Sequence, residues 1–182
     1  MGLMVPERRR GTEFLDDPHT IPGAQAVREL ADVVRTNALF GGTAAVLAEL
    51  RAVLPALPKR ATLLDVGTGL GDRPARAAAL ARDRGQTLVT IGLERAEALA
   101  RAARGALTAP LVADAFRLPF ADHSVDVVTC SQVLHHFAEP EALALLAECE
   151  RVARRRVVIA DLRRSWVAAA GVWSASWPLG FS

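Results

Sequence analysis

Three alternating glycines follow an acidic residue at the end of an apolar run, and this is where the chain shows its first recognisable chemistry. The run is Leu-Leu-Asp-Val-Gly-Thr-Gly-Leu-Gly over residues 63–71. Glycines let the backbone turn sharply and let a ligand approach where a Cβ would collide. The pattern predicts a strand that breaks into a nucleotide-binding loop. A helix follows, with Asp72 as its N-cap and Pro74 in its first turn.

The spacing of the glycines separates two classes of ligand. Dinucleotide-binding turns have the order G-x-G-x-x-G and place a pyrophosphate on the helix N-terminus. Here the third glycine comes one residue early, and Asp72 occupies the last position of that fingerprint, where its carboxylate would repel a phosphate. The order acid-x-G-x-G-x-G resembles motif I of class I S-adenosylmethionine-dependent methyltransferases, whose ligand has no phosphate. The alternative is an ordinary tight turn in an α/β protein.

A second acid stands at the end of the next strand-like run. Residues 87–93 are apolar and β-branched, Glu94 follows them, and a helical segment is expected over residues 96–106. An acid at the carboxyl end of the second strand can accept hydrogen bonds from both hydroxyls of a ribose. The alternative is that Glu94 charges the first turn of the next helix.

The segment 111–128 carries the closest resemblance to a known family. Its sequence, with Asp114-Ala115-Phe116 followed by R-L-P-F-A-D-H-S-V-D-V-V, is similar to small-molecule methyltransferases related to the ubiquinone and menaquinone biosynthesis enzymes (methyltransferase type 11). The resemblance implies that Asp114 accepts from the adenine amino group, that the Ala115 backbone meets the ring edge, and that Phe116 lies against the ring face. The alternatives are an Asx-turn at Asp114 and a core position for Phe116.

The same resemblance assigns Asp65 to the methionine end of S-adenosylmethionine and the glycine loop to its floor. Ser131 and Gln132, at the carboxyl end of a fourth strand, are expected near the transferred methyl group. The complete set of expected cofactor-binding residues is Asp65, Gly67, Thr68, Gly69, Gly71, Glu94, Asp114, Ala115, Phe116, Ser131 and Gln132.

Paired histidines follow this fourth strand and are the candidate catalytic residues. His135 or His136 can act as general base for a hydroxyl acceptor, because imidazole titrates near neutrality. Neighbouring side chains on a helix or strand point in different directions, so at most one is expected to face the substrate, and the family pattern favours His136. A structural role for both is the alternative. No metal is expected, because His136 and Glu139 have no further ligands nearby.

Composition limits the classes of partner. The chain has 182 residues, 51% of them hydrophobic, which predicts a single core. A formal net charge of +2 does not favour nucleic acid. Cys130 and Cys149 lack metal or redox spacing and are expected to be reduced structural thiols of a cytoplasmic protein. Four arginines are expected on a solvated helix face: Arg73, Arg76, Arg82 and Arg84.

Four segments are expected along the chain. Residues 1–22 form a basic N-terminal segment that lacks the apolar region of an export signal, and residues 23–58 form a helical lid. Within the lid, a helix is expected from Thr43, as N-cap, to Leu54. Asn37, Phe40, Gly41 and Gly42 are candidates for the moving part of the lid, and the favoured alternative for them is a plain interhelical turn. Residues 59–161 form the cofactor-binding core, and residues 162–182 form an apolar tail with all three tryptophans.

The expected fold is α/β, a doubly wound, mostly parallel Rossmann-like sheet with strand order 3-2-1-4-5. Strand five is expected over residues 156–161, and the 21 residues beyond it are too few for the family's C-terminal helix and hairpin. An exposed apolar edge on strand five favours pairing, so a homo-oligomer through that edge or through the tail is expected. The tail reaches the length of a membrane span, but its serines, glycines and Pro178 make a stable span unexpected.

The resemblance to these methyltransferases implies methyl transfer from S-adenosylmethionine to a small, rather apolar acceptor, at oxygen or carbon. Two alternatives stay open. One is a catalytically incomplete cofactor-binding subunit that needs a partner. The other is an NAD-dependent oxidoreductase, which Asp72 in the phosphate position disfavours.

Overall fold

The computed structural model describes residues 23–39 and 41–161. The expectations for residues 1–22, for Phe40 and for the tail 162–182 fall outside the described residues, and so does the question of a C-terminal hairpin.

The described core is a five-stranded parallel sheet. Its strands are β1 (Arg60–Val66), β2 (Thr87–Glu94), β3 (Ala109–Val112), β4 (Val125–Ser131) and β5 (Ala153–Ala160). The spatial order is β3-β2-β1-β4-β5, and every neighbouring pair is parallel. The predicted strand order and fold class are confirmed.

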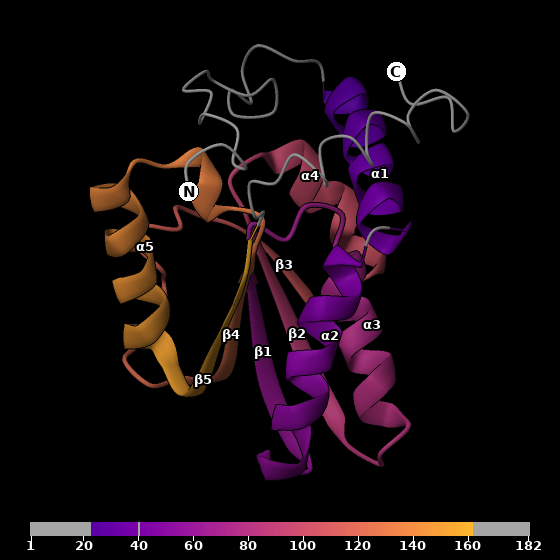
Figure 1. Ribbon diagram of the computed structural model, residues 1–182, viewed down its shortest axis with the longest axis vertical. Helices are drawn as coiled ribbons and strands as arrows, with labels where there is room; N and C mark the ends of the chain where they lie inside the picture. Colours follow the sequence, from indigo (N-terminus) through magenta and orange to yellow (C-terminus); the bar gives the residue numbers. More distant parts are fainter. Residues whose placement is uncertain (1–22, 40, 162–182) are drawn as a thin grey trace, which may run out of the picture.

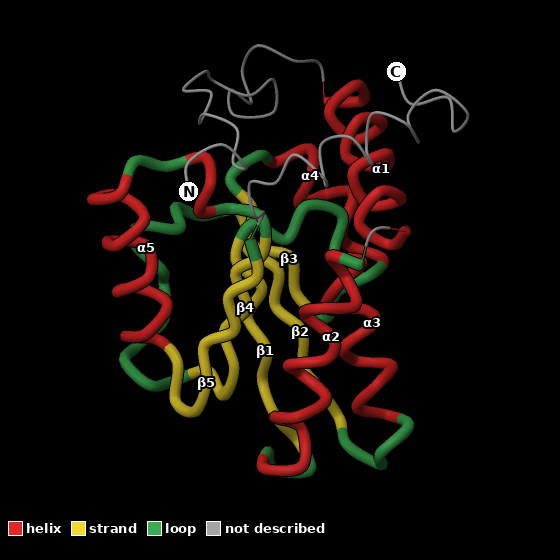
Figure 2. The backbone as a smooth tube through the Cα atoms, in the orientation of Figure 1, coloured by secondary structure: helices red, strands yellow, loops and turns green. Residues whose placement is uncertain are grey.

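Helices cover both faces of this sheet. They are α1 (Gly23–Leu39), α2 (Gly42–Val53), α3 (Asp72–Arg82), α4 (Glu97–Ala102) and α5 (Glu139–Val152), with 3₁₀ turns at Leu54–Ala56, Ala103–Gly105 and Leu134–His136. Figure 1 shows α5 on one face, and α2 and α3 on the other. The tube in Figure 2 shows the loops that join strands to helices gathered at the two ends of the sheet.

Alternation along β1 divides the apolar side chains between two cores. Leu63 packs in the cluster with α2 and α3, whereas Leu64 and Val66 pack in the cluster with α5. Successive side chains of a strand point to opposite faces, so Asp65 shares the α2/α3 face with Leu63. Because of this alternation, the buried Asp65 carboxylate lies on the side of the sheet that α2 and α3 cover.

The N-cap positions of two helices are occupied by glycines and not by the predicted polar residues. Gly71 precedes α3 with φ 74°, and Gly41 precedes α2 with φ 87°. Asp72 is therefore the first residue of α3 and not its N-cap, and Thr43 lies buried within α2. Left-handed backbone is accessible to glycine without a Cβ clash, so both helices start earlier than the polar residues indicated.

The predicted helical lid comprises two helices with different surroundings. Val46, Leu50 and Leu54, in and just after α2, are buried against the sheet, so α2 forms part of the core layer. In contrast, α1 packs on α4 at the carboxyl end of the strands, where a Cβ on Gly23 would lie 2.6 Å from Ala98 Cβ. Only α1 occupies the place expected for a lid (Figure 1).

Strand β5 differs from the strand predicted there. It begins at Ala153 and includes Arg154, Arg155 and Arg156, all exposed, so only its second half is apolar. Charged residues on an edge strand disfavour pairing with other chains. Beside this strand, a groove of about 530 Å³ runs between β5 and the end of α2, lined by Val53, Leu57, Val157 and Ile159 among others.

No single helix among the described residues is long and apolar enough to cross a membrane. The two helical segments Gly23–Leu39 and Gly42–Ala56, which are bent relative to each other, have the length and composition of a membrane span only when they are taken together. Such a bent pair is weak evidence for a span.

Candidate functional site

The candidate site lies at the carboxyl ends of the parallel strands, where the loops after β1, β2, β3 and β4 meet. The backbone N–H groups of Gly67 and Thr68 donate to the Leu93 carbonyl at 2.9 and 3.0 Å, which ties the glycine loop to the end of β2. Ligands of open α/β sheets bind at this edge. The edge brings together loops separated by tens of residues in the sequence.

The glycine loop requires glycine at its turning points. Gly67 and Gly69 have φ 67° and 57°, a region that L side chains rarely adopt. A Cβ on Gly69 would lie 2.8 Å from Leu30 Cδ2 of α1, and a Cβ on Gly67 would lie 2.5 Å from Val133 Cγ2. Apolar side chains from α1 and from the loop after β4 therefore cover this loop. Gly71 has the same backbone conformation (φ 74°).

Asp65 is a buried carboxylate with an incomplete set of partners. It is 1% exposed, and its Oδ1 accepts from Thr129 Oγ1 at 2.6 Å. Within residues 23–39 and 41–161, no group donates to its Oδ2. Burial raises the pKa of Asp65 above its ordinary value, while the positive charge of Arg73 and the Thr129 hydrogen bond lower it. Asp65 thus keeps capacity to accept a donor from a ligand.

Arg73 is buried, contrary to the prediction of a solvated position. It is 9% exposed, and its Nη1 donates to Gln132 Oε1 at 3.4 Å. Arg73 shares a helix face with Ala77 and Ala81, which are buried, whereas Arg76 is exposed. The spacing of four residues puts the three on one face, and this face packs on the sheet.

Glu94 joins the glycine loop to the start of α4. Its Oε2 accepts from the Gly69 N–H at 3.0 Å, and its Oε1 accepts from the N–H groups of Arg95 at 2.8 Å and Ala96 at 3.4 Å. Ala96 is the N-cap residue of α4, so its hydrogen bond to Glu94 matches the alternative role, in which Glu94 places a negative charge at the start of the next helix. An ionised carboxylate has about four lone-pair sites, so capacity for ribose hydroxyls remains.

Asp114, Ala115 and Phe116 lie in the loop after β3. Asp114 Oδ1 accepts from the Phe116 N–H at 2.9 Å, which makes the Asx-turn named as the alternative. The Phe116 ring stands edge-on to Phe137 with centroids 5.0 Å apart and adjoins the α5-side core. The turn holds Ala115 in the middle of the loop, at the site edge.

Arg151 of α5 fixes the loop that carries these residues. It donates to the carbonyls of Leu118 and Phe120 at 3.0 and 2.9 Å and pairs with Glu148 and Asp122 at 2.8 Å. Glu148 Oε2 also accepts from the Leu118 N–H at 2.9 Å. Hydrogen bonds from Arg151 lower the pKa of Glu148 to about 2. The connection from β3 to β4 is therefore anchored to α5 by charged hydrogen bonds.

Ser131 is the last residue of β4 and Gln132 directly follows it, at the carboxyl end of the fourth strand as predicted. Ser131 is buried, and Gln132 has φ 58°, which turns the chain toward α1. The amides of Gln132 and Asn37 bond to each other reciprocally, and Asn37 is itself buried. Thr68 is buried with its side chain against Gly92, where a Cβ would lie 2.7 Å from Thr68 Cγ2. Gln132 thus connects the lid helix, the sheet and Arg73.

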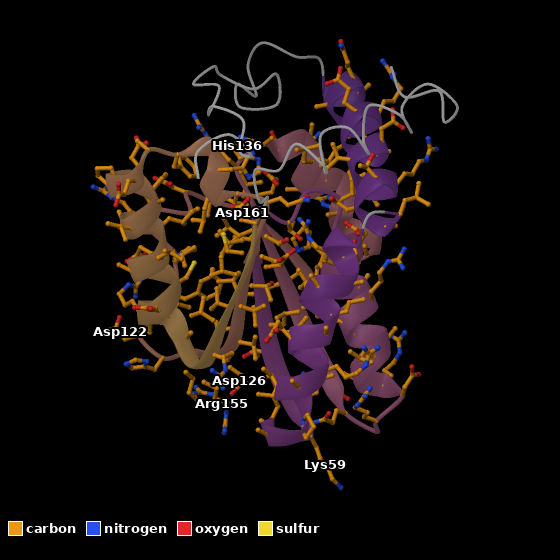
Figure 3. All side chains as sticks on the ribbon, viewed as in Figure 1. Lys59, Asp122, Asp126, His136, Arg155 and Asp161 are labelled. Atoms are coloured by element: carbon orange, nitrogen blue, oxygen red, sulfur yellow. The ribbon has the colours of Figure 1, made fainter. Side chains whose placement is uncertain are left out.

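The two histidines are arranged differently from the prediction. They lie in a 3₁₀ turn with their ring centroids 4.1 Å apart, so their rings do not diverge as they would on a regular helix or strand. His135 Nδ1 lies 2.6 Å from Asp161 Oδ1, and the His135 N–H donates to Asp161 Oδ2 at 3.2 Å. Figure 3 shows His136 and Asp161 at the carboxyl edge, and Asp126 and Arg155 at the opposite edge.

No metal centre is formed by the part of the chain that the structure describes. In residues 23–39 and 41–161, no three His, Cys, Asp or Glu side chains come together as a metal ion would need.

Comparison with known proteins identifies the family. Residues 64–160 match the family model described as "Methyltransferase domain". The chain belongs to this methyltransferase family. The predicted family is therefore confirmed, and with it the predicted cofactor, S-adenosylmethionine.

Individual relatives of this methyltransferase chain include a curated enzyme and solved structures. It is 41% identical over 100 residues to the ubiquinone/menaquinone biosynthesis C-methyltransferase UbiE of Dinoroseobacter shibae, covering 50% of this chain and 38% of that relative. It is 27% identical, with TM-score 0.51, to a chain of the complex between the Haloferax volcanii Trm112 methyltransferase activator and a candidate methyltransferase. The match covers 72% of this chain and 53% of that chain. Magnesium protoporphyrin IX methyltransferase of Synechocystis shares the fold at 19% identity and TM-score 0.53, covering 84% and 66%.

The residues of the methyltransferase site fit the chemistry of S-adenosylmethionine. The methionine end of this cofactor carries an ammonium and a carboxylate, and the site holds the buried atoms Asp65 Oδ2 and Arg73 Nε, to which no described residue is bonded. Glu94 and Asp114 extend the acceptor set along the ends of β2 and β3. Asp65, near the end of β1, is therefore a hydrogen-bond acceptor for a positively charged group. Arg73, at the start of α3, is a donor for a negatively charged group.

Sequence reasoning missed Arg73 and Asp161 as site residues. The helical spacing to Ala77 and Ala81 could have placed Arg73 on the buried face. Asp161 ends the predicted fifth strand, and carboxyl ends of neighbouring parallel strands meet at one edge, so its approach to the loop after β4 was also foreseeable.

Proposed function

We propose that this chain binds S-adenosylmethionine along the carboxyl edge of its sheet and transfers the methyl group to a small, apolar acceptor at oxygen or carbon. The observation that carries the proposal is the placing of Asp65, Glu94 and Asp114 at the ends of three successive strands, beside a loop of left-handed glycines. Asp65 would accept from the ammonium, Glu94 from the ribose hydroxyls and Asp114 from the adenine amino group.

The residues around the loop would exclude water and align the acceptor. Leu30 of α1 and Val133 cover the glycines, so closure of α1 would separate the site from solvent. When bound, S-adenosylmethionine supplies an electrophilic methyl group on a sulfonium sulfur. Holding an acceptor in line with that methyl group is worth about 7–11 kcal/mol of barrier.

His135 is the better placed of the two proposed general bases for a hydroxyl acceptor. Its Nδ1 hydrogen-bonds Asp161 Oδ1, which orients the ring and makes Nε2 its proton-accepting nitrogen. His135 Nε2 would accept the hydroxyl proton of the acceptor as its oxygen takes the methyl group that S-adenosylmethionine supplies. His136, which the family pattern favoured as the general base, lies in the same 3₁₀ turn.

The relatives suggest the class of acceptor. One is named for ubiquinone and menaquinone biosynthesis, and another, which shares the fold, is named for magnesium protoporphyrin IX. We propose a phenol, quinone or related small molecule for this chain. Nucleic acid is not proposed, because the formal net charge is only +2.

A second candidate function is a cofactor-binding subunit that turns over only with a partner. The chain spans less than two fifths of the curated relative's length, and another relative is solved together with an activator protein. Strand β5 has no further neighbour in the described sheet. A homo-oligomer through the β5 edge or through residues 162–182 is the partner we propose. A cytoplasmic location is proposed from the two free, buried cysteines.

Calorimetric titration with S-adenosylhomocysteine tests the proposal, with NAD as control and the mass in solution measured on the same sample. Micromolar binding of S-adenosylhomocysteine alone is expected. Binding without methylation of any phenolic or quinone acceptor would favour the subunit function. Tight binding of NAD, or no nucleoside binding by folded protein, would contradict the proposal.

A further inference from the structure

Arg73 is a buried cation whose neighbours do not complete its hydrogen bonding. It is 9% exposed, yet its Nε has no acceptor within residues 23–39 and 41–161. The hydrogen bond that its Nη1 donates to Gln132 Oε1 is long at 3.4 Å. A buried guanidinium normally places its five N–H donors on carboxylates or carbonyls. Arg73 therefore has donor capacity that the described protein does not use.

The position of Arg73 in its helix makes this cation unfavourable without an anion. Arg73 is the second residue of α3, an 11-residue helix, and the N-terminus of a helix carries positive partial charge. The nearby anion Asp65 offsets the charge in part, but burial raises the pKa of Asp65 and its Oδ1 already accepts from Thr129. A second anion at this place would be stabilised by both the guanidinium and the helix N-terminus.

The guanidinium contacts a residue of the candidate site, because its Nη1 donates to Gln132 Oε1 at 3.4 Å. Gln132 directly follows β4 at the carboxyl edge, and the Gln132 amide is held in turn by Asn37 of α1. Arg73 thus lies beside the glycine loop, next to Asp65 and beneath the lid helix. These are the surroundings expected for the amino-acid end of the cofactor.

We propose that Arg73 binds the carboxylate of the methionine moiety of S-adenosylmethionine, while Asp65 accepts from its ammonium group. This inference rests on the proposed function. A zwitterion presents one charge of each sign, and the pair of Arg73 and Asp65 matches both. Arginine is suited to this role because its planar fork can bind a carboxylate through two parallel hydrogen bonds.

Ligand truncation tests the assignment in the unmodified protein. S-adenosylhomocysteine is compared by calorimetry with its decarboxylated analogue, 5′-deoxy-5′-(3-aminopropylthio)adenosine, which lacks only the carboxylate. The unmodified chain is expected to bind S-adenosylhomocysteine roughly ten- to a hundredfold more tightly, because charged hydrogen bonds are lost with the carboxylate. Equal affinities would overturn the proposal.

Substitution of Arg73 completes the comparison. In Arg73→Met the preference between the two ligands is expected to fall below about threefold, with affinity for the decarboxylated analogue kept. Arg73→Lys retains the charge and is expected to keep part of the preference. Arg76→Met, on an exposed face of the same helix, is the matched control and should keep all of it.

The outcomes separate this inference from the proposed function. If folded, unmodified protein binds neither ligand, the proposed function itself fails. If Arg73→Met weakens both ligands equally while the melting temperature falls, Arg73 serves only to neutralise Asp65, and the assignment is wrong. Should Arg73→Met not fold, the truncated ligand still decides, because equal affinities for the two ligands in the unmodified chain contradict carboxylate binding. Arg73→Lys then supplies the variant, and its preference is expected to be smaller than that of the unmodified chain.

Discussion

The side-chain amides of Asn37 and Gln132 pair reciprocally at 2.5 Å and join the last turn of α1 to the residue that follows β4. The pair spans 95 positions of sequence. Space for it depends on Gly42, where a Cβ would lie 3.0 Å from Asn37 Oδ1 and 3.4 Å from Gln132 Nε2. Helix α1, the proposed lid, is thus attached to the strand end that is expected to lie near the transferred methyl group.

Replacing Asn37 by Ala should loosen α1 over the glycine loop. A buried amide that loses its partner costs about 1 kcal/mol, so amide exchange over residues 23–39 is expected to accelerate roughly fivefold. Hydrogen exchange read by mass spectrometry measures this. Asp32→Ala is the control, since it removes only an exposed pair with Arg35 at 3.0 Å. Equal acceleration in both variants would show that the amide pair does not hold the helix.

Glu94→Ala should weaken S-adenosylhomocysteine binding roughly ten- to a hundredfold, through loss of charged hydrogen bonds to the ribose. Some of the loss would come from the Gly69 N–H, which donates to Glu94 at 3.0 Å. Titration calorimetry measures the dissociation constant. Glu97→Ala, at an exposed pair with Arg101, should leave it unchanged. An unaltered affinity in Glu94→Ala would disprove the ribose assignment.

His135→Asn should reduce kcat for a hydroxyl acceptor about a hundredfold or more, while the affinity for S-adenosylhomocysteine changes little. Asp161→Asn is expected to show a smaller loss of kcat, because it removes the carboxylate 2.6 Å from His135 Nδ1. Steady-state kinetics with a phenolic acceptor measures both. A large effect of His136→Asn with none of His135→Asn would assign the base to His136 instead.

Glu148→Gln should remove stability that depends on pH. The pKa of Glu148 is lowered to about 2 by hydrogen bonds from Arg151, so its contribution is full above the ordinary value of 4.5 and is lost as pH falls from 4.5 towards 2. Near pH 7 the variant is expected to be less stable by about 1 kcal/mol, after allowance for solvent screening. The difference should vanish near pH 2.

Urea unfolding at several pH values measures this dependence. Glu150→Gln is the matched control, because Glu150 is exposed on the same helix. A constant difference between Glu148→Gln and the unmodified chain across the whole pH range would contradict the assignment.

Ile159→Lys should reduce association if the β5 edge forms the proposed oligomer. Ile159 is 39% exposed and lies in the apolar half of β5, so a charge there disfavours pairing of two edges. Light scattering after size exclusion gives the mass. An unmodified chain that is monomeric at micromolar concentration would remove the proposal, and an oligomer that persists in Ile159→Lys would exclude this edge.

Local sequence alone determined much of this protein. The alternating glycines after Asp65, and the acid that follows the apolar run at 87–93, specified strands, turns and their order, because each signal lies within a few residues. Alternating strands and helices indicate parallel strands whose carboxyl ends form the edge that holds the site. The order 3-2-1-4-5 was implied by the resemblance to class I methyltransferases.

Tertiary structure decided which side chains meet at that edge. Arg73 is buried while Arg76 is exposed, and His135 approaches Asp161 across 26 residues. Cys130 and Cys149, whose spacing indicates no metal or redox site, pack in the same core cluster between β4 and α5. Such contacts depend on how strands and helices are packed in three dimensions, and sequence separation gives no measure of that distance.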